Sequence, residues 1–300
     1  MSKSVFVIGI QRSGTTWLAN LLCNHSKIVG VQREPFGILE SAYFSHVDNF
    51  FGNLRRNHNF IQFVETYASS DYFRATGLDK DLLYKNRPKT YSQAFKLIMD
   101  TLAEKHNADY WLEKSPAHSL YLRKISIYFP DAKFIRIKRN LYDVITSAIR
   151  KTHIKNKLMK KIYILIRLIQ YRKYESYIKK FESQTNRLLM LSYESVRKNI
   201  ENNMNDICKF LGINFEPNML KTDYKPNTSF ESFVNTTERK TVLTNSERKL
   251  IKMLNTILKV IPFNIYRIIF YFQVNVRKKG FPRWFWMYYE KDKFQKIIIK

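Results

Sequence analysis

The chain is poor in cysteine, which excludes the disulfide-stapled class of small secreted proteins. Its 300 residues contain two cysteines, Cys23 and Cys208, and both lie in apolar patterns with helical spacing. Two cysteines are too few for a disulfide framework, and their separation does not match a metal site. We therefore expect two buried thiols, no bound metal and a reducing compartment.

Acidic residues are also scarce. The chain has 25 Asp and Glu residues against 52 Lys and Arg residues, which gives a formal net charge of +27. A single small anionic ligand does not require so many cations. Three explanations compete, namely nucleic-acid binding, attraction to an anionic membrane surface, and a general lysine bias of the sequence.

Long uncharged apolar runs are missing as well. Residues 259–300 are dense in Phe, Trp and Tyr, but Pro262 and Arg267 interrupt them before they reach the length of a membrane-spanning helix. Cations that alternate with aromatics are typical of helices at a membrane interface and of proteins that bind single-stranded nucleic acid. Ile and Leu at helical spacing favour the membrane, and a helix packed on the core is the remaining alternative.

An apolar strand pattern begins four residues after Met1, which leaves no room for a signal peptide or an N-terminal anchor. We therefore expect a cytoplasmic protein with a main domain over residues 1–255. A basic, aromatic helical extension is expected over residues 256–300, peripheral on the inner face of the membrane. Nucleic acid is the less favoured partner.

Glycine is scarce too, yet two of the eight glycines, Gly9 and Gly14, stand five positions apart near the start. They enclose a turn after the apolar, β-branched run 5–10, which is typical of a strand buried on both faces of a parallel sheet. A helical apolar pattern begins at Thr15. Such a strand, turn and helix start form an anion site, because the free N–H groups and the positive end of the helix dipole face the turn.

The spacing of this turn is close to that of a nucleotide-binding P-loop. Gly9, Gly14, Thr15 and Thr16 stand at the fixed positions of G-x-x-x-x-G-K-[ST], but Thr15 replaces the lysine and the cation is Arg12, inside the turn. We also find no persuasive aspartate to hold Mg²⁺. These departures argue against a P-loop nucleotide kinase or NTPase, which is kept as an alternative.

Two motifs together resemble those of one enzyme family. The run RSGTTWL, residues 12–18, resembles the 5′-phosphosulfate loop of sulfotransferases that use 3′-phosphoadenosine 5′-phosphosulfate (PAPS). Arg139 follows the strand pattern 133–138, and Ser147 lies two turns into the next helix, which resembles the 3′-phosphate site of the same family. The resemblance implies an α/β fold, with a mostly parallel central sheet flanked by helices in a P-loop NTPase-like three-layer sandwich.

The resemblance also implies how PAPS is held, without a metal ion. A guanidinium fork and a neutral donor suit the 3′-phosphate dianion, so Arg139 and Ser147 are assigned to it. Tyr193, in a Tyr-Glu pair after a late strand, is expected near the adenosine. The 5′-phosphosulfate is assigned to Gln11, Arg12, Ser13, Gly14, Thr15 and Thr16. Weaker candidates for closing over the nucleotide are Ser229, Ser232 and Arg239.

The expected reaction needs a base, because an acceptor hydroxyl must lose its proton. Glu34 resembles the glutamate base that several sulfotransferase groups carry soon after the first helix, and its alternative is a surface carboxylate. His118, in the segment EKSPAHS, is the second candidate base. Arg12 and Lys114 are expected to offset charge on the leaving phosphate.

The sequence therefore predicts a PAPS-dependent sulfotransferase that acts on an acceptor hydroxyl, most suitably of a saccharide or glycolipid. A third hypothesis, a non-enzymatic basic module for membranes or nucleic acid, leaves residues 5–22 unexplained.

Overall fold

The centre of the fold is a five-stranded sheet in which every pair of neighbouring strands is parallel. The computed structural model describes residues 2–34, 37–152, 154, 156–221, 243–276, 281 and 283–286. The strand order is β2-β5-β1-β6-β7. The strands are β1 (Lys3–Ile8), β2 (Ile28–Gly30), β5 (Tyr110–Glu113), β6 (Lys133–Lys138) and β7 (Leu188–Ser192).

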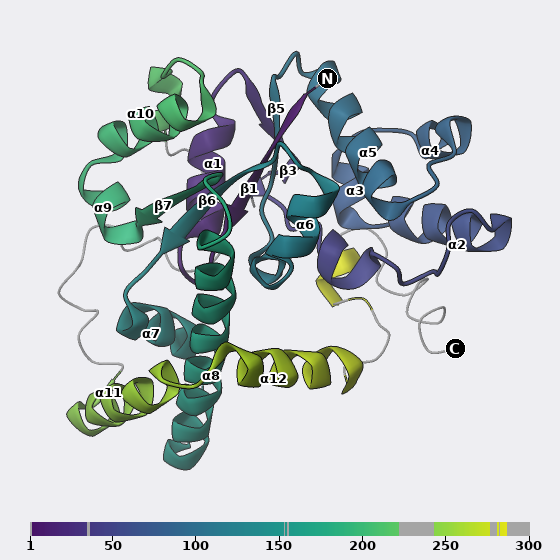
Figure 1. Ribbon diagram of the computed structural model, residues 1–300. Coiled ribbons are helices and arrows are strands. Elements are labelled where there is room, and N and C mark those ends of the chain that lie inside the picture. The colour runs from purple at the N-terminus through teal and green to yellow at the C-terminus, as the bar shows by residue number, and fades with distance from the viewer. Residues whose placement is uncertain are drawn as a thin grey trace.

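Helices cover both faces of this sheet (Figure 1), which confirms the predicted three-layer α/β architecture. Successive side chains of β1 alternate between two apolar cores, because a strand sends neighbouring side chains to opposite faces. Val5 and Val7 belong to one core, and Phe6 and Ile8 to the other. The first core is covered by α1 (Thr15–Cys23) and α10 (Ile200–Leu211), and the second by α2 (Asn57–Ala68), α5 (Tyr91–Lys105) and α6 (Leu122–Tyr128).

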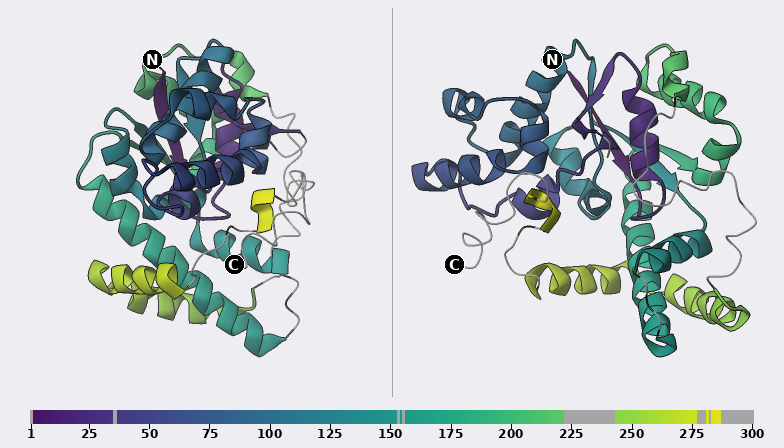
Figure 2. Two further views of the ribbon diagram at one scale, coloured as in Figure 1. Left: turned by 90° about the vertical axis from the view of Figure 1, so that its right-hand side faces the viewer. Right: turned by 180° about the vertical axis from the view of Figure 1, so that it is seen from behind.

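A third group of helices lies beyond the carboxyl edge of the sheet, at the lower end of the molecule in Figures 1 and 2. Ile164 and Leu168 of the longest helix are buried against Val144 and Ile145 of the helix before it, and against Ile251. The group consists of α7 (Leu141–Thr152), α8 (Lys157–Glu182), α11 (Asn245–Lys259) and α12 (Phe263–Val276).

Short elements connect these layers. A hairpin and a π-helical turn link α1 to α2, and a 3₁₀ turn follows β5. They are β3 (Gln32–Arg33), β4 (Gly37–Ile38), η1 (Tyr43–Val47), α3 (Asp71–Ala75), α4 (Asp81–Asn86), η2 (Pro116–Leu120), α9 (Tyr193–Lys198), η3 (Pro217–Leu220) and η5 (Arg283–Trp286).

Two sequence predictions need their boundaries revised. The first strand covers residues 3–8 instead of 5–10, because the turn begins at Gly9, whose φ of 155° a side chain rarely allows. The division predicted after residue 255 falls inside α11. The extension also contributes to the core, where Phe285 and Trp286 are buried and Trp286 Nε1 donates a hydrogen bond to Ser69 Oγ at 2.9 Å.

Among the described residues, no single helix has the length and apolar composition needed to cross a membrane. Helices α11 and α12 meet those criteria only as a pair, and the pair is bent by 103°.

Candidate active site

The turn between β1 and α1, residues 9–14, is shaped by its two glycines, and we refer to it as the glycine turn. Gly14 has a φ of 100°, and a Cβ atom there would lie 2.6 Å from Tyr193 Cδ2. A Cβ at Gly9 would lie 2.7 Å from the carbonyl oxygen of Ile137. Both positions therefore require glycine, since the backbone of the turn packs directly on β6 and α9.

Ser13 shapes the glycine turn from inside. Its side chain is fully buried, and both its backbone N–H and its Oγ donate to the carbonyl oxygen of Ile10, at 3.1 Å and 2.7 Å. Both donors of Ser13 are thus used within the turn. The predicted contact of Ser13 with the phosphosulfate stays a prediction.

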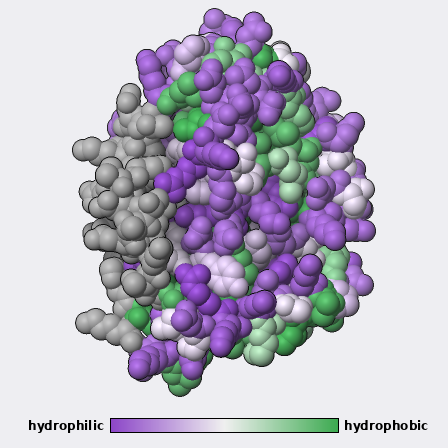
Figure 3. Space-filling model, turned by 90° about the vertical axis from the view of Figure 1, so that its left-hand side faces the viewer, coloured by the Kyte–Doolittle hydropathy of each residue, from purple (hydrophilic) through white to green (hydrophobic). Residues whose placement is uncertain are grey.

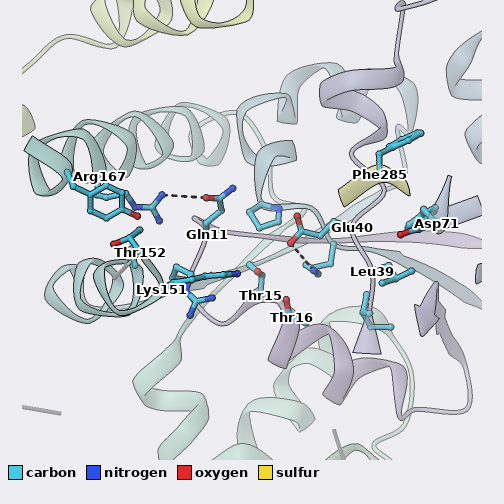
Figure 4. Close-up of a pocket in the computed structure, with 17 residues that line it drawn as sticks. Gln11, Thr15, Thr16, Leu39, Glu40, Asp71, Lys151, Thr152, Arg167 and Phe285 are labelled. Carbon is cyan, nitrogen blue, oxygen red and sulfur yellow. Dashed lines mark hydrogen bonds and ion pairs between the residues drawn. The ribbon is translucent and has the colours of Figure 1, made fainter. Parts of the chain in front are cut away.

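Four of the other residues predicted to bind the phosphosulfate, though not Gly14, border an open cavity of about 570 Å³ (Figure 4). Its wall includes Gln11, Arg12, Thr15 and Thr16. Thr15 and Thr16 begin α1, so helix geometry leaves their backbone N–H groups without intrahelical partners. The two threonines therefore place hydroxyls and N–H groups beside the positive end of the helix dipole.

Arg12 links the glycine turn to α7 by a hydrogen bond, as expected if the two sequence motifs belong to one site. Its backbone is in the left-handed region, with a φ of 74°, which residues other than glycine rarely adopt. Arg12 Nε donates to Ser147 Oγ at 3.1 Å, and Arg139 NH1 donates to the carbonyl oxygen of Arg12 at 3.2 Å. The structure therefore brings Arg12, Arg139 and Ser147 together.

A third arginine, Arg167 of α8, completes a group that we call the arginine cluster (Arg12, Arg139 and Arg167). Burial lowers the pKa of the Arg12 guanidinium, and the nearby charges of Arg139 and Arg167 lower it further. In the described structure, the buried Nε atoms of Arg139 and Arg167 have no hydrogen-bond partner. Like charges held together with unused donors form a site for a multiply charged anion.

The opposite end of the same cavity carries an ion pair. Lys114, directly after β5, is 2% exposed, and its Nζ lies 3.1 Å from Glu40 Oε1. The Glu40 carboxylate is 35% exposed, so it faces the cavity. Figure 4 shows Glu40 across the cavity from Lys151, Thr152 and Arg167.

Glu34, by contrast, lies away from this chemistry. It is exposed directly after β3, and it lines neither this cavity nor the second one described below. The β3–β4 hairpin separates Glu34 from Glu40, so the later glutamate reaches the cavity. Glu40 is thus the glutamate that borders the described cavity, and the role of Glu34 as a base stays a prediction.

His118 is also removed from the cavity. It is fully buried, its Nδ1 lies 2.7 Å from Glu113 Oε2, and its Nε2 accepts a hydrogen bond from the backbone N–H of Phe44 at 3.1 Å. Because Nε2 accepts, the ring proton is on Nδ1 and points to Glu113. Both ring nitrogens are engaged, so the prediction of His118 as a base is corrected to a structural role.

Glu113 is the centre of this buried network, which we call the Glu113 cluster (Glu113, Ser41, Ser115 and His118). Ser41 Oγ and Ser115 Oγ donate to Glu113 Oε1 at 2.7 Å and 2.5 Å. Burial alone raises the pKa of Glu113, but His118 and the two hydroxyls outweigh it and lower the pKa below its usual range. The cluster fixes the segment that carries Glu40 onto the end of β5.

Tyr193 packs against Arg139 of the arginine cluster. It is buried, its ring lies 5.3 Å from that of Trp17, and the Arg139 guanidinium carbon stands 4.4 Å from its ring centre. Tyr193 therefore orients Arg139 and limits the space at Gly14. Its predicted contact with adenosine is outside what the structure tests, and Ser229, Ser232 and Arg239 lie outside the described residues.

A second cavity of about 320 Å³ adjoins the first, and the two share Gln11 and Arg167 on their walls. Its other walls come from η1, η2, α8 and α12, with polar groups such as His46 and Gln170 and apolar ones such as Phe270. Both cavities therefore border the glycine turn at Gln11.

Sequence reasoning missed Glu40, Arg167, Lys151 and Glu113. The rule that pointed to Glu34, a glutamate soon after the first helix, applies equally to Glu40. Glu113 lies in the segment EKSPAHS, where the sequence indicated no role for it. Arg167 and Lys151 were part of a long basic region with no local sign of which cation turns inward.

Comparison with known proteins agrees with this geometry. A sequence model described as "Sulfotransferase family" matches residues 4–217. The chain therefore belongs to the sulfotransferase family. A search of curated protein sequences found no match.

Solved structures with similar folds are themselves described as sulfotransferases. The sulfotransferase domain from the curacin biosynthetic pathway is 22% identical, with 76% of this chain and 79% of that one covered and a TM-score of 0.51. The corresponding domain of the Synechococcus PCC 7002 olefin synthase is 16% identical over 94% of this chain and 96% of its own, with a TM-score of 0.49. A mouse sulfotransferase crystallised with PAP is 13% identical over 89% and 87%, with a TM-score of 0.45. The first of these similarities shows the shared fold.

Proposed function

We propose that this protein is a PAPS-dependent sulfotransferase that sulfates an acceptor hydroxyl. One observation carries the proposal: Arg12 and Arg167 of the arginine cluster line the same cavity as the Glu40–Lys114 pair. The first suits a donor with several anionic groups, and the second provides a carboxylate for an acceptor proton.

The donor PAPS supplies a sulfuryl group, whose bond to the 5′-phosphate oxygen breaks as a new S–O bond to the acceptor oxygen forms. On this chain, the glycine turn and the N–H groups that open α1 are suited to the 5′-phosphosulfate. Arg139 and Ser147 are suited to the 3′-phosphate, next to Arg12. Lys114 would offset the negative charge that develops on the leaving phosphate.

Glu40 is the base in this proposal. Its carboxylate faces the cavity, and its hydrogen bond with Lys114 orients it. Removal of the acceptor proton by Glu40 would leave a neutral carboxyl beside Lys114, whose ammonium could then serve the leaving phosphate. The Glu113 cluster holds both residues in place through Ser41 and Ser115.

The acceptor is proposed to be a saccharide or glycolipid. The two cavities that border the glycine turn offer polar side chains, including Gln170, His46 and Asp71. Apolar groups such as Tyr72 and Phe285 line the far wall of the first cavity. Mixed polar and apolar walls suit a sugar, which presents both hydroxyls and C–H faces.

The donor assignment is tested by titrating the protein with 3′,5′-ADP, the product of PAPS, in a calorimeter. We expect binding that neither Mg²⁺ nor ATP alters. Absence of binding by folded protein would reject PAPS as the donor, and tight Mg²⁺-dependent ATP binding would favour the P-loop NTPase alternative.

The base assignment predicts the largest effect on activity. Glu40→Gln should lower sulfate transfer from radiolabelled PAPS to a lipid and glycan extract by about 10²- to 10⁴-fold, because a general base contributes that much. Its affinity for 3′,5′-ADP should stay near that of the wild type. The matched control Glu34→Gln makes the same change at an exposed position of the hairpin and should keep full activity. Loss of transfer in the control, with transfer retained in Glu40→Gln, would reject Glu40 as the base.

A further inference from the structure

The helices α8, α11 and α12 expose apolar side chains that the fold itself does not use. Most of the exposed large hydrophobic residues in the described structure belong to this group. Along α11 they are spaced as one helical stripe, at Met253, Ile257 and Val260, with exposures of 55%, 54% and 77%. Similar stripes are Leu158, Ile162 and Leu165 on α8, and Ile265, Ile268 and Phe272 on α12. We call these three stripes the docking surface.

The helices that carry the stripes are packed together at one end of the molecule. Arg172 Nε of α8 donates to Asn255 Oδ1 of α11 at 2.6 Å, and Tyr266 OH of α12 donates to the carbonyl oxygen of Leu258 at 2.5 Å. Figures 1 and 2 show the three helices at the lower end. In Figure 3, hydrophobic residues reach the surface at this end among hydrophilic ones.

The charges around the docking surface have one sign. Residues 157–174 contain no Asp or Glu, and residues 245–276 contain only Glu247. Glu247 is buried and paired with Lys160 at 2.9 Å, so no exposed carboxylate lies on these parts of the three helices. The exposed cations there are Lys157, Lys161, Arg248, Lys249, Lys252, Lys259 and Arg267.

These properties decide between possible occupants. A second copy would bring another positive surface against this one, and like charges repel. A nucleic acid would satisfy the cations, but its phosphates gain nothing from exposed Ile, Leu and Met stripes. An anionic phospholipid surface satisfies both features, because apolar side chains enter the acyl region while Lys and Arg contact the headgroups.

We propose that the docking surface attaches this protein to an anionic phospholipid membrane. The exposed stripes of α8, α11 and α12 enter the interface, without any helix that spans it, and the flanking lysines and arginines bind the headgroups.

The same placement has a consequence for the acceptor, which rests on the proposed function. The second cavity is lined by Phe270, Gln273 and Val274 of α12, and Val274 is 46% exposed. This cavity therefore reaches the protein surface on a helix of the docking surface, and it shares Gln11 and Arg167 with the first cavity. A lipid-linked saccharide held in the membrane would thus meet a cavity that is bordered both by α12 and by Gln11 of the glycine turn.

The test is sedimentation of the full chain with vesicles of phosphatidylcholine, with and without phosphatidylglycerol. We expect binding only when phosphatidylglycerol is present, and weaker binding as salt increases. The double variant Ile257→Ser/Ile268→Ser should bind about tenfold more weakly, because two apolar side chains leave the interface. Its matched control, Ile61→Ser/Ile127→Ser, changes the same residue type at equally accessible positions elsewhere and should bind normally.

A second pair of variants tests the charges independently. Lys249→Gln/Lys252→Gln should weaken binding, whereas Lys85→Gln/Lys89→Gln, which removes equal charge on the far side of the sheet, should not. The proposal is overturned if the wild type does not bind vesicles, or if each docking-surface variant binds vesicles as well as its matched control does. It is also overturned if Ile257→Ser/Ile268→Ser converts a dimer to a monomer, or if single-stranded RNA displaces the vesicles. Vesicle binding without 3′,5′-ADP binding would leave the docking surface standing and reject the proposed donor.

Discussion

Two groups of buried or half-buried charged side chains lie at the carboxyl edge of the sheet, and they are built in opposite ways. In the Glu113 cluster, one carboxylate receives hydrogen bonds from two hydroxyls and a histidine, so each group has its partner inside the protein. In the arginine cluster, three cations lie together, and the buried Nε atoms of Arg139 and Arg167 have no partner among the described residues.

The difference separates a network that is complete within the protein from a cluster that is suited to an added anion. A buried polar group is stabilising only when it is paired, so a complete network such as the Glu113 cluster maintains the fold. A group of like charges lowers the free energy of unfolding of the empty protein, and a bound anion raises that free energy again. Variants in each cluster test this difference.

The largest effect is expected at Glu113. Glu113→Ala should lower the free energy of unfolding by about 3–5 kcal/mol, because it leaves Ser41, Ser115 and His118 without their buried acceptor. The measurement is urea unfolding followed by circular dichroism. Glu113→Gln should cost less, about 1–3 kcal/mol, because the amide oxygen still accepts from the serines while one N–H opposes His118 Nδ1. Equal stability of Glu113→Ala and wild type would contradict the structural role.

The second-largest effect is expected on the affinity for 3′,5′-ADP when Arg139 is replaced. Arg139→Ala should weaken 3′,5′-ADP by about 10- to 100-fold, since a charge-assisted hydrogen bond contributes about 1.5–3 kcal/mol. Binding of 5′-AMP, which lacks the 3′-phosphate, should change much less in the same calorimetric titration. Arg123→Ala, an exposed arginine on α6, is the control. Equal losses for the two nucleotides would remove the 3′-phosphate assignment.

The Glu113 cluster also predicts a pH dependence. Because the folded-state pKa of Glu113 is lowered from its ordinary value of 4.5, its contribution to stability is fully present above that value. The contribution is lost as the pH falls through the lower, folded-state pKa. Urea unfolding at a series of pH values should therefore show a loss of stability on the acid side that is flatter in Glu113→Gln. If the free energy of unfolding falls with the same slope at acid pH in that variant as in the wild type, the loss of stability comes from other carboxylates.

The smallest effect is expected for Arg12 in the empty protein. Arg12→Gln removes the hydrogen bond to Ser147, but it also relieves repulsion from Arg139 and Arg167, so stability should change by less than about 1 kcal/mol. Urea unfolding without ligand measures this. In the presence of 3′,5′-ADP, the wild type should gain more stability than the variant. A loss as large as that of Glu113→Ala would show that Arg12 belongs to the fold and not to the binding site.

Much of the fold was predictable from local patterns. Gly9, Gly14 and the apolar run before them identified a strand, turn and helix start, since few other residues permit that backbone. Strand β6 was predicted with its observed bounds, and Arg139 directly after it was placed at the correct edge. These features depend on interactions between residues that are adjacent in the chain, so they can be read from the sequence directly.

Which glutamate borders the cavity was not predictable in the same way. Glu34 and Glu40 are six residues apart, and the sequence contains no property that distinguishes them as bases. The β3–β4 hairpin leaves Glu34 in solvent and lets Glu40 reach Lys114, 74 residues further along the chain. His118 had a suitable residue type and position, but burial and two hydrogen bonds engage both nitrogens.

By itself, the sequence determined the class of sheet, the place and chemistry of the glycine turn, and membership of its two motifs in one site. Each of these follows from periodicity, glycine conformation or side-chain type over a few adjacent residues. Only the tertiary structure decided which glutamate faces the cavity, which histidine is buried, and that Arg167 from α8 joins Arg12 and Arg139. Those outcomes depend on contacts between segments far apart in the chain, where packing and burial select one side chain among several of equal chemistry.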